Sequence, residues 1–236
     1  MRLNLYIAKG GVVSRRGADR LIKEGKVRIN GRIVREPFYR VTEKDSVTVK
    51  EKKVIFKENI YIIFHKPEGV ITTLKDKFAD KKIMDLLPAR FEGVYPVGRL
   101  DKNSSGLIIL TNDGQLCYAL THPKFEVEKE YLVRVRGKLS QDSCRRAEKG
   151  VVDEGDLLRV KKVKIIRASA ERSLCKVVVS EGKKRHLRRL FKQLGLPVLQ
   201  LKRVRIGNLR LGSLREAEYK IVEKERIYRN ALGNLG

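Results

Sequence analysis

The stretch VYPVGRLDKNSSGLIILTNDG at residues 94–114 sets an irregular segment in front of a continuous apolar run. Leu-Ile-Ile-Leu at 107–110 predicts a buried strand, and Asn-Asp-Gly at 112–114 predicts the turn that ends it. Asp101 lies in the irregular part, with cations at Arg99 and Lys102. Loops held by rigid elements often carry reactive groups, and an ionised, positioned carboxylate can attack an electrophilic carbon or stabilise a cation. Asp101 is therefore a catalytic candidate, although most loop aspartates form turns or caps.

The composition indicates a partner with many negative charges. The chain has 236 residues, of which 54 are Lys or Arg and 28 are Asp or Glu, so its formal net charge is +26. Such an excess of cations repels itself in a folded protein and is typical of proteins that bind nucleic acid. Apolar residues make up 42% of the chain, which is enough for a core and argues against a disordered basic tail.

Membrane and secreted classes are not favoured. There is no apolar run of about 18 residues for a membrane span, and the first residues lack the pattern of a signal peptide. The three cysteines are widely spaced, without a metal-ligand pattern, and predict reduced thiols in the cytoplasm. We expect a soluble monomer that binds neither membrane nor DNA.

Residues 1–50 predict a small RNA-binding domain, followed by a linker at 51–58. Ser14 is placed to cap a helix from Arg15 to about residue 24, and Gly25 suits the position after its end. Asn30-Gly31 predicts a two-residue hairpin turn between short strands. Unmatched cations on this helix and hairpin predict contacts to phosphates, whereas the ordinary alternative is a solvated charged face. The predicted RNA-binding residues here are Ser14, Arg15, Arg16, Arg20, Lys26, Arg28 and Arg32.

Residues 59–236 predict a larger mixed domain rich in antiparallel strands, so the fold class is α+β. Strands are predicted at residues 60–64, 130–136, 157–167 and 174–180. A helix is predicted at about 184–194, because Leu187, Leu190, Phe191 and Leu194 recur at the helical period.

Several motifs in this second part resemble those of one enzyme family. Residues 98–101 (Gly-Arg-Leu-Asp), 105–107 (Ser-Gly-Leu) and 111–114 (Thr-Asn-Asp-Gly) resemble the signature of RNA pseudouridine synthases. Residues 65–69 (HKPEG) and 181–191 (EGKKRHLRRLF) are similar to two further motifs of the same family. Residues 14–16 and 25–31 resemble the S4 RNA-binding domain. The order of the motifs fits the bacterial enzymes that act on ribosomal RNA.

The resemblance implies roles for individual residues. Asp101 matches the essential aspartate, which attacks C1′ of the ribose or removes a C2′ proton, and Tyr131 matches the tyrosine that stacks on the base. Lys183 matches the basic residue expected to pair with the aspartate. Arg185 is its neighbour and competitor, and is itself expected to bind substrate. Leu187 matches an apolar residue near the base, and plain helix core is an equal alternative for it. Arg99 and Lys66 are predicted to contact substrate, although a salt bridge that shapes the loop would also explain Arg99.

The remaining cations predict a rim that contacts RNA phosphates. Arg188 and Arg189 belong to this predicted RNA-binding set, and further candidates are Arg134, Arg136, Arg203 and Arg205. The chemistry that the resemblance implies has no redox change, so no cofactor or metal is expected. The expected partner is ribosomal RNA or a pre-ribosomal particle.

Three alternatives stay open from the sequence. Residues 12–16 and 203–207 look closer to the enzymes of the large-subunit 23S RNA than to the 16S enzyme. A non-catalytic S4-domain assembly factor would explain the charge but not the Gly-Arg-Leu-Asp motif. A DNA-binding or hydrolytic enzyme lacks paired carboxylates and a phosphate loop in this sequence.

Overall fold

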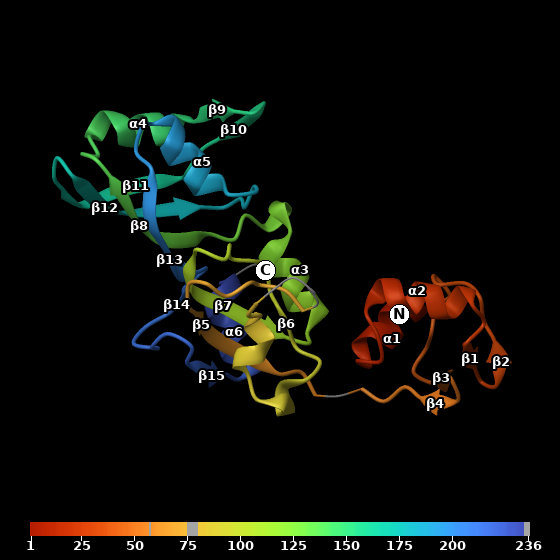
Figure 1. Ribbon diagram of the computed structural model, residues 1–236. Coiled ribbons are helices and arrows are strands. Elements are labelled where there is room, and N and C mark those ends of the chain that lie inside the picture. The colour runs from red at the N-terminus through yellow and green to blue at the C-terminus, as the bar shows by residue number, and fades with distance from the viewer. Residues whose placement is uncertain (57, 75–79, 234–236) are drawn as a thin grey trace. The chain divides into compact units, whose positions relative to one another are not determined.

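The computed structural model describes residues 1–56, 58–74 and 80–233. It divides into two compact units, Met1–Asn59 with Asn112–Gly114, and Ile60–Thr111 with Gln115–Gly236 (Figure 1). Among the described residues, no helix is both long and apolar enough to cross a membrane.

The first unit packs two helices against a small sheet. Helices α1 (Leu3–Lys9) and α2 (Arg15–Lys23) accompany β1 (Val27–Ile29), β2 (Arg32–Ile33), β3 (Val47–Val49) and β4 (Lys52–Lys53), which pair in the order β2-β1-β3-β4. The Ser14 hydroxyl accepts a hydrogen bond from the Gly17 amide at 3.2 Å, so the predicted cap is confirmed. The turn residues Asn30 and Gly31 have φ values of 51° and 82°, as the predicted hairpin requires.

The linker predicted at 51–58 differs from the structure. Lys52–Lys53 forms β4 and pairs with β3, and Val54 is buried in the core of the first unit. The sheet and core of this unit therefore include residues 52–54 of the predicted linker. Residue 57 of the predicted linker lies outside the described residues.

A nine-stranded sheet forms the centre of the second unit. Its main order is β11-β12-β8-β13-β7-β5-β15, with β14 on β13 and β6 on β7. The pairing of β13 with β7 is parallel, and the other pairings described in this sheet are antiparallel. The predicted α+β class is confirmed. The strands are β5 (Tyr61–Lys66), β6 (Tyr95–Pro96), β7 (Ser105–Thr111), β8 (Lys129–Arg136), β11 (Lys162–Ala168), β12 (Arg172–Val179), β13 (Val198–Ile206), β14 (Leu209–Arg210) and β15 (Tyr219–Ile221).

Helices cover this sheet through three apolar clusters. Helices α4 (Gln141–Lys149) and α5 (His186–Gln193) pack on β8, β11 and β12 (Figure 1). Strand β7 is buried on both faces, because Leu107 and Ile109 pack with α3 (Gly114–Thr121) and α6 (Lys224–Leu232), whereas Ile108 and Leu110 pack on the opposite side. The smaller elements are the 3-10 turns η1 (Ile83–Leu86), η2 (Ala89–Phe91) and η3 (Pro123–Phe125), and the hairpin of β9 (Val151–Asp153) with β10 (Asp156–Leu158).

Candidate active site

A small open pocket in the second unit gathers six of the predicted site residues. Its free volume is about 100 Å³. The walls come from the loop before β7, from β8, β12 and β13, and from the segment that leads into α5. The predicted residues in the lining are Arg99, Asp101, Tyr131, Lys183, Arg185 and Leu187.

Asp101 has a half-buried side chain that the rest of the described chain leaves unpaired. No ion pair or side-chain hydrogen bond joins its carboxylate to another described residue, while its main-chain carbonyl accepts from the Ser104 amide at 3.0 Å. The preceding residue, Leu100, is buried, and both its amide and its carbonyl bond to the Thr72 hydroxyl at 3.3 and 2.8 Å. The loop is therefore fixed through its main chain, and the carboxylate is left for another partner.

Lys66 binds the main chain of the same loop. Its side chain is fully buried in β5, and its Nζ donates to the carbonyls of Ser104 at 2.7 Å, Pro67 at 2.9 Å and Lys102 at 3.5 Å. Burial lowers the pKa of Lys66 to about 8, although Glu68 and Asp101 favour its charged form. The expected substrate contact is wrong for this residue, because its ammonium is out of reach of solvent. Lys66 positions the loop instead.

Arg188 also fastens the loop instead of lying free on the rim. Its Nη2 donates to the Asn103 carbonyl at 2.5 Å and its Nη1 to the Val198 carbonyl at 3.4 Å. Burial lowers its pKa. The cation predicted to meet RNA phosphate thus links α5 to the segment that carries Asp101.

Tyr131 faces the pocket from β8, backed by a buried arginine. Arg203 Nη1 lies 3.5 Å from the Tyr131 hydroxyl, and Arg203 Nε donates to the Leu107 carbonyl at 2.7 Å. Arg203 is 5% exposed, so its predicted place on the rim is wrong. It connects β13 to β7 and supports the tyrosine.

Lys183 does not make the predicted ion pair with Asp101. Its Nζ donates to the Leu157 carbonyl at 2.9 Å and lies 3.6 Å from Asp156. Both partners belong to β10, which supplies a carboxylate and a carbonyl to the same ammonium. Lys183 lines the same pocket as Asp101, but its ammonium is engaged by β10.

Two predicted cations remain free at the mouth of the pocket. Arg99 and Arg185 are exposed, and no described residue forms an ion pair with either. Arg185 takes a left-handed conformation with φ 51° directly before α5. The salt bridge considered for Arg99 is absent within the described chain. Leu187 packs in the α5 core and lines the pocket, and its contact with the base stays a prediction.

Arg189 is the clearest departure from the predicted rim. Its guanidinium contacts Asp153 at 2.5 Å and Asp156 at 2.9 Å, and also donates to the Asp153 carbonyl at 2.6 Å. The hydrogen bonds to Arg189 lower the pKa of both carboxyl groups. A bidentate site of this kind satisfies the guanidinium, so Arg189 fixes the β9–β10 hairpin to α5 and is not available to RNA.

The cations of the first unit divide into paired and free groups. Glu24 lies 2.7 Å from Lys26 and 3.9 Å from Arg20, and Arg28 lies 3.2 Å from Glu51. These pairs correct the inference that the cations are unmatched by acids. They are exposed, so they contribute little to stability and phosphates can compete for them.

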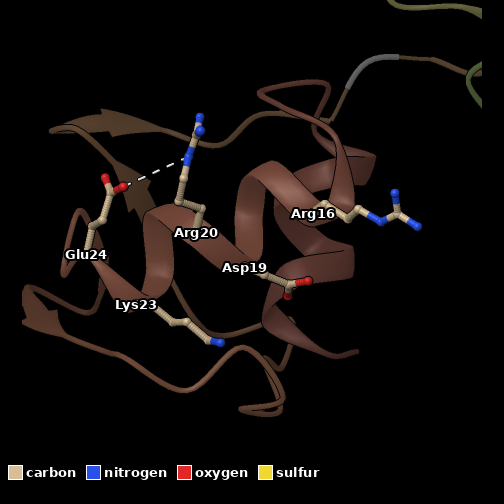
Figure 2. Close-up of a pocket in the computed structure, with 5 residues that line it drawn as sticks. All are labelled: Arg16, Asp19, Arg20, Lys23 and Glu24. Atoms are coloured by element: carbon tan, nitrogen blue, oxygen red, sulfur yellow. Dashed lines mark ion pairs between the residues drawn. The ribbon is translucent and has the colours of Figure 1, made fainter.

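Helix α2 carries several free cations of this unit, and β2 carries Arg32. An open pocket along α2 is lined by Arg16, Asp19, Arg20, Lys23 and Glu24, whose side chains are drawn in Figure 2. Arg15, Arg16 and Arg32 are exposed and form no ion pair with a described residue. Ser14 uses its hydroxyl oxygen as the helix cap.

Two titratable residues with lowered pKa values, one of them in the pocket lining, were not predicted as site residues from the sequence. His186 lines the pocket and is 5% exposed, and burial lowers its pKa. Lys129 lies on β8, where burial lowers its pKa to about 8. His186 could not be predicted as buried from the helical period, because it lies before the first residue of the apolar face. Lys129 was missed because the alternation of the strand places it at a polar position.

Comparisons with known proteins agree over both units. A family model described as RNA pseudouridylate synthase matches residues 60–193, and the S4 domain model matches residues 1–47. The chain is 36% identical to "Ribosomal large subunit pseudouridine synthase B" of Bacillus subtilis (strain 168), covering 100% of this chain and 98% of that protein. It is 34% identical to an "Uncharacterized RNA pseudouridine synthase" of Aquifex aeolicus (strain VF5), covering 96% and 94%. A solved structure described as "Crystal structure of pseudouridylate synthase" matches with a TM-score of 0.68 and 27% identity, covering 96% and 98% of the two chains.

Proposed function

This chain belongs to the RNA pseudouridylate synthase family, and on that premise we propose that it converts one uridine of 23S ribosomal RNA to pseudouridine. The family makes it an enzyme that isomerises uridine in RNA. The choice of the large-subunit RNA is supported by the 36% identity to the Bacillus subtilis enzyme over both units. The observation that carries the proposed site is the pocket that joins Asp101 to Tyr131 beneath two free arginines.

In the proposed mechanism, Asp101 is the reacting carboxylate. It attacks C1′ of the ribose, or it removes a C2′ proton, and the bond from C1′ to N1 of uracil breaks. The uracil turns while bound against Tyr131, and C5 bonds to C1′ as the ester bond between Asp101 and C1′ breaks or, on the second route, as Asp101 returns the C2′ proton. C5 then loses its proton and N1 gains one. Atoms and electrons balance without an oxidant or reductant. The open carboxylate of Asp101 and the fixed main chain of its loop suit this role.

The pocket also fits a base that arrives from outside the fold. A uridine within folded RNA must leave its stack before C1′ is reachable, at a cost of a few kcal/mol. The free volume of about 100 Å³ leaves little room for a nucleoside, so we propose that Arg99 and Arg185 move outward to phosphates as the base enters. We further propose that the chain acts as a monomer in the cytoplasm.

The target is tested by mapping pseudouridine in both ribosomal RNAs. RNA from cells with and without the protein is compared, and the deletion strain is complemented with the wild-type or the Asp101→Asn chain. We expect one 23S position to lose its pseudouridine and to regain it only with the wild type. Loss at a 16S position instead would assign the enzyme to the small subunit.

We expect the double substitution of Arg15 and Arg16 by alanine to weaken RNA binding without changing kcat at saturating RNA. Each phosphate contact contributes about 0.7–0.9 to the slope of log K against log salt, so the slope should fall by roughly 1.5. The control removes Lys52 and Lys53, two exposed cations of β4 in the same unit. An equal loss of slope in the control would show that only net charge matters.

We expect Lys66→Met to lower kcat by about 10- to 100-fold, because a misplacement of about 1 Å at the reacting group costs up to about 10²-fold. The melting temperature should fall, because the carbonyls of Ser104 and Pro67 lose their Lys66 donor and a buried acceptor left unsatisfied costs about 1–3 kcal/mol. The pKa of Lys66, about 8 in the fold, lies below its ordinary value. Its charged form therefore opposes folding below pH 8, and its contribution to stability rises as the pH increases beyond 8.

The same pKa predicts an alkaline loss of activity. Above pH 8 the Lys66 amine has fewer protons to donate to the loop carbonyls, so kcat should decline in the wild type, and Lys66→Met should lack this decline. Lys129→Met is the matched control, because Lys129 has a similarly lowered pKa of about 8 but donates to none of the carbonyls of this loop. An alkaline decline that disappears with Lys129 and persists without Lys66 would contradict the assignment.

A further inference from the structure

A cluster of aromatic rings and one ammonium lies where α3 ends and η3 begins. The Tyr118 ring is centred 4.8 Å from the His122 ring and 5.6 Å from the Phe125 ring. Lys124 Nζ lies 5.2 Å from the centre of the Tyr118 ring and 4.7 Å from that of Phe125. Four side chains within eight residues therefore combine aromatic faces with positive charge at one place.

The cluster is exposed and held in a fixed shape. Tyr118 is 48% exposed, and His122 and Lys124 are exposed as well. Phe125 anchors the group, because it is half-buried against the core of α3 and α6. His122 Nδ1 accepts from the Lys124 amide at 3.2 Å, which fixes the imidazole ring and leaves its Nε2 outside the cap. Core packing explains Phe125 but not the exposure of Tyr118 and His122, whose rings lie against one another with Lys124 over the Tyr118 ring.

This cluster lies next to the segment that leads to Asp101. A Cβ added at Gly98 would be 3.7 Å from Thr121 Cγ2. Thr121 is the last residue of α3, directly before His122, and Gly98 directly precedes Arg99 of the pocket. The end of α3 and the pocket loop are therefore in contact.

We propose that Tyr118 and His122 form a stacking platform for an unpaired base of the RNA, with Lys124 contacting the adjoining phosphate. The inference rests on the proposed function, because a target uridine that leaves its stack leaves its neighbours without partners. Aromatic faces bind any base, since every base has a π face. The excess of 26 positive charges in the chain favours RNA over a protein as the occupant.

The test compares RNA binding by variants of the full-length chain. Filter binding uses 23S and 16S transcripts at several salt concentrations. Tyr118→Ala should weaken binding of the converted transcript by about 5- to 150-fold, the range measured for stacking of one base on an aromatic ring. Tyr118→Phe should bind within about twofold of the wild type, as expected if the ring and not the hydroxyl stacks. Wild-type affinity in Tyr118→Ala, or equal losses in the two variants, would overturn the proposal.

The role of the Lys124 ammonium is tested against a similar contact between a lysine and a tyrosine ring on α6. Lys124→Ala should weaken binding and lower the salt slope by about one phosphate contact. Lys224→Ala is the control, because Lys224 Nζ lies 5.8 Å over the Tyr228 ring on α6, the same type of contact on another helix. If the two substitutions change the affinity and the salt slope equally, Lys124 contributes only through the net charge of the chain, and the proposed phosphate contact is overturned.

A second variant and a second transcript make the test of the platform independent of the proposed 23S target. If Tyr118→Ala melts well below the wild type, His122→Ala tests the platform in its place. Conversion of a 16S uridine instead of a 23S uridine would overturn the proposed target, while the same variants on the 16S transcript still test the platform. If the wild type and all ring variants bind the converted transcript with equal affinity, whether it is 23S or 16S, the stacking platform is overturned.

Discussion

Asp101→Asn should abolish uridine conversion while the protein stays folded and bound to RNA. The expected loss in kcat is at least about 10³-fold, because removing a reacting side chain from a catalytic unit costs this much or more. The side chain is half-buried and has no ion pair with a described residue, so an amide of the same size should cost little stability. The measurement is release of the C5 hydrogen from RNA labelled at that position, together with filter binding.

Asp80 offers the control for this substitution. Its carboxylate lies 3.4 Å from Lys102 Nζ, so Asp80→Asn removes one negative charge beside the same loop without touching the pocket. It should leave kcat within about twofold, since the pair is exposed and screened. Asp101→Ala guards against conversion of the asparagine back to aspartate. Activity of Asp101→Ala within tenfold of the wild type would exclude Asp101 as the reacting group.

Local signals in the sequence predicted the elements that depend on neighbours in the chain. Ser14 caps α2, and Asn30-Gly31 turns the first hairpin, because both features are set by a few adjacent residues. The apolar period of α5 and the buried run of β7 were visible for the same reason. The short acidic hairpin β9–β10 was not, and the strand predicted at 157–167 is divided between β10 and β11.

Helix α4 shows why other elements were missed. It buries only Cys144 and Ala147 among its nine residues, so it has almost no apolar period to detect. Its helical conformation depends on the Ser140 cap and on packing against the sheet.

The roles of the cations could not be predicted, because they depend on distant partners. Arg189 is held by carboxylates more than 30 residues away in the sequence, and Lys66 by carbonyls of residues 102 and 104. A single sequence shows their charge but not which charges are buried. The resemblance placed Asp101, Tyr131 and Lys183 around one pocket, but it did not predict Asp156 as the partner of Lys183.

Gly106→Ala should have the largest effect on folding. Gly106 has φ 108°, and a Cβ added there would lie 2.2 Å from the Arg203 carbonyl oxygen and 2.6 Å from the Arg203 amide nitrogen. Both atoms belong to the main chain of β13, so no side-chain movement relieves the clash. The parallel pairing of β7 with β13, at Ser105 with Lys202 and Gly106 with Arg203, must open. The cost should exceed about 4 kcal/mol, the range of the most damaging single substitutions.

Gly93→Ala separates the clash from backbone strain. Gly93 has a similar φ of 97°, but a Cβ added there meets no atom within 4 Å. This control should cost only the left-handed strain of about 1–2 kcal/mol. Since 1 kcal/mol shifts the melting temperature by about 2–4 °C in a protein of this size, Gly106→Ala should melt at least about 8 °C below the wild type, and Gly93→Ala much less. Equal losses would mean that glycine is needed at 106 for its φ alone. A greater loss of melting temperature for Gly106→Ala would instead show that β7 and β13 lie too close together at this point for any Cβ. This is the part of the sheet where Arg203 reaches Tyr131.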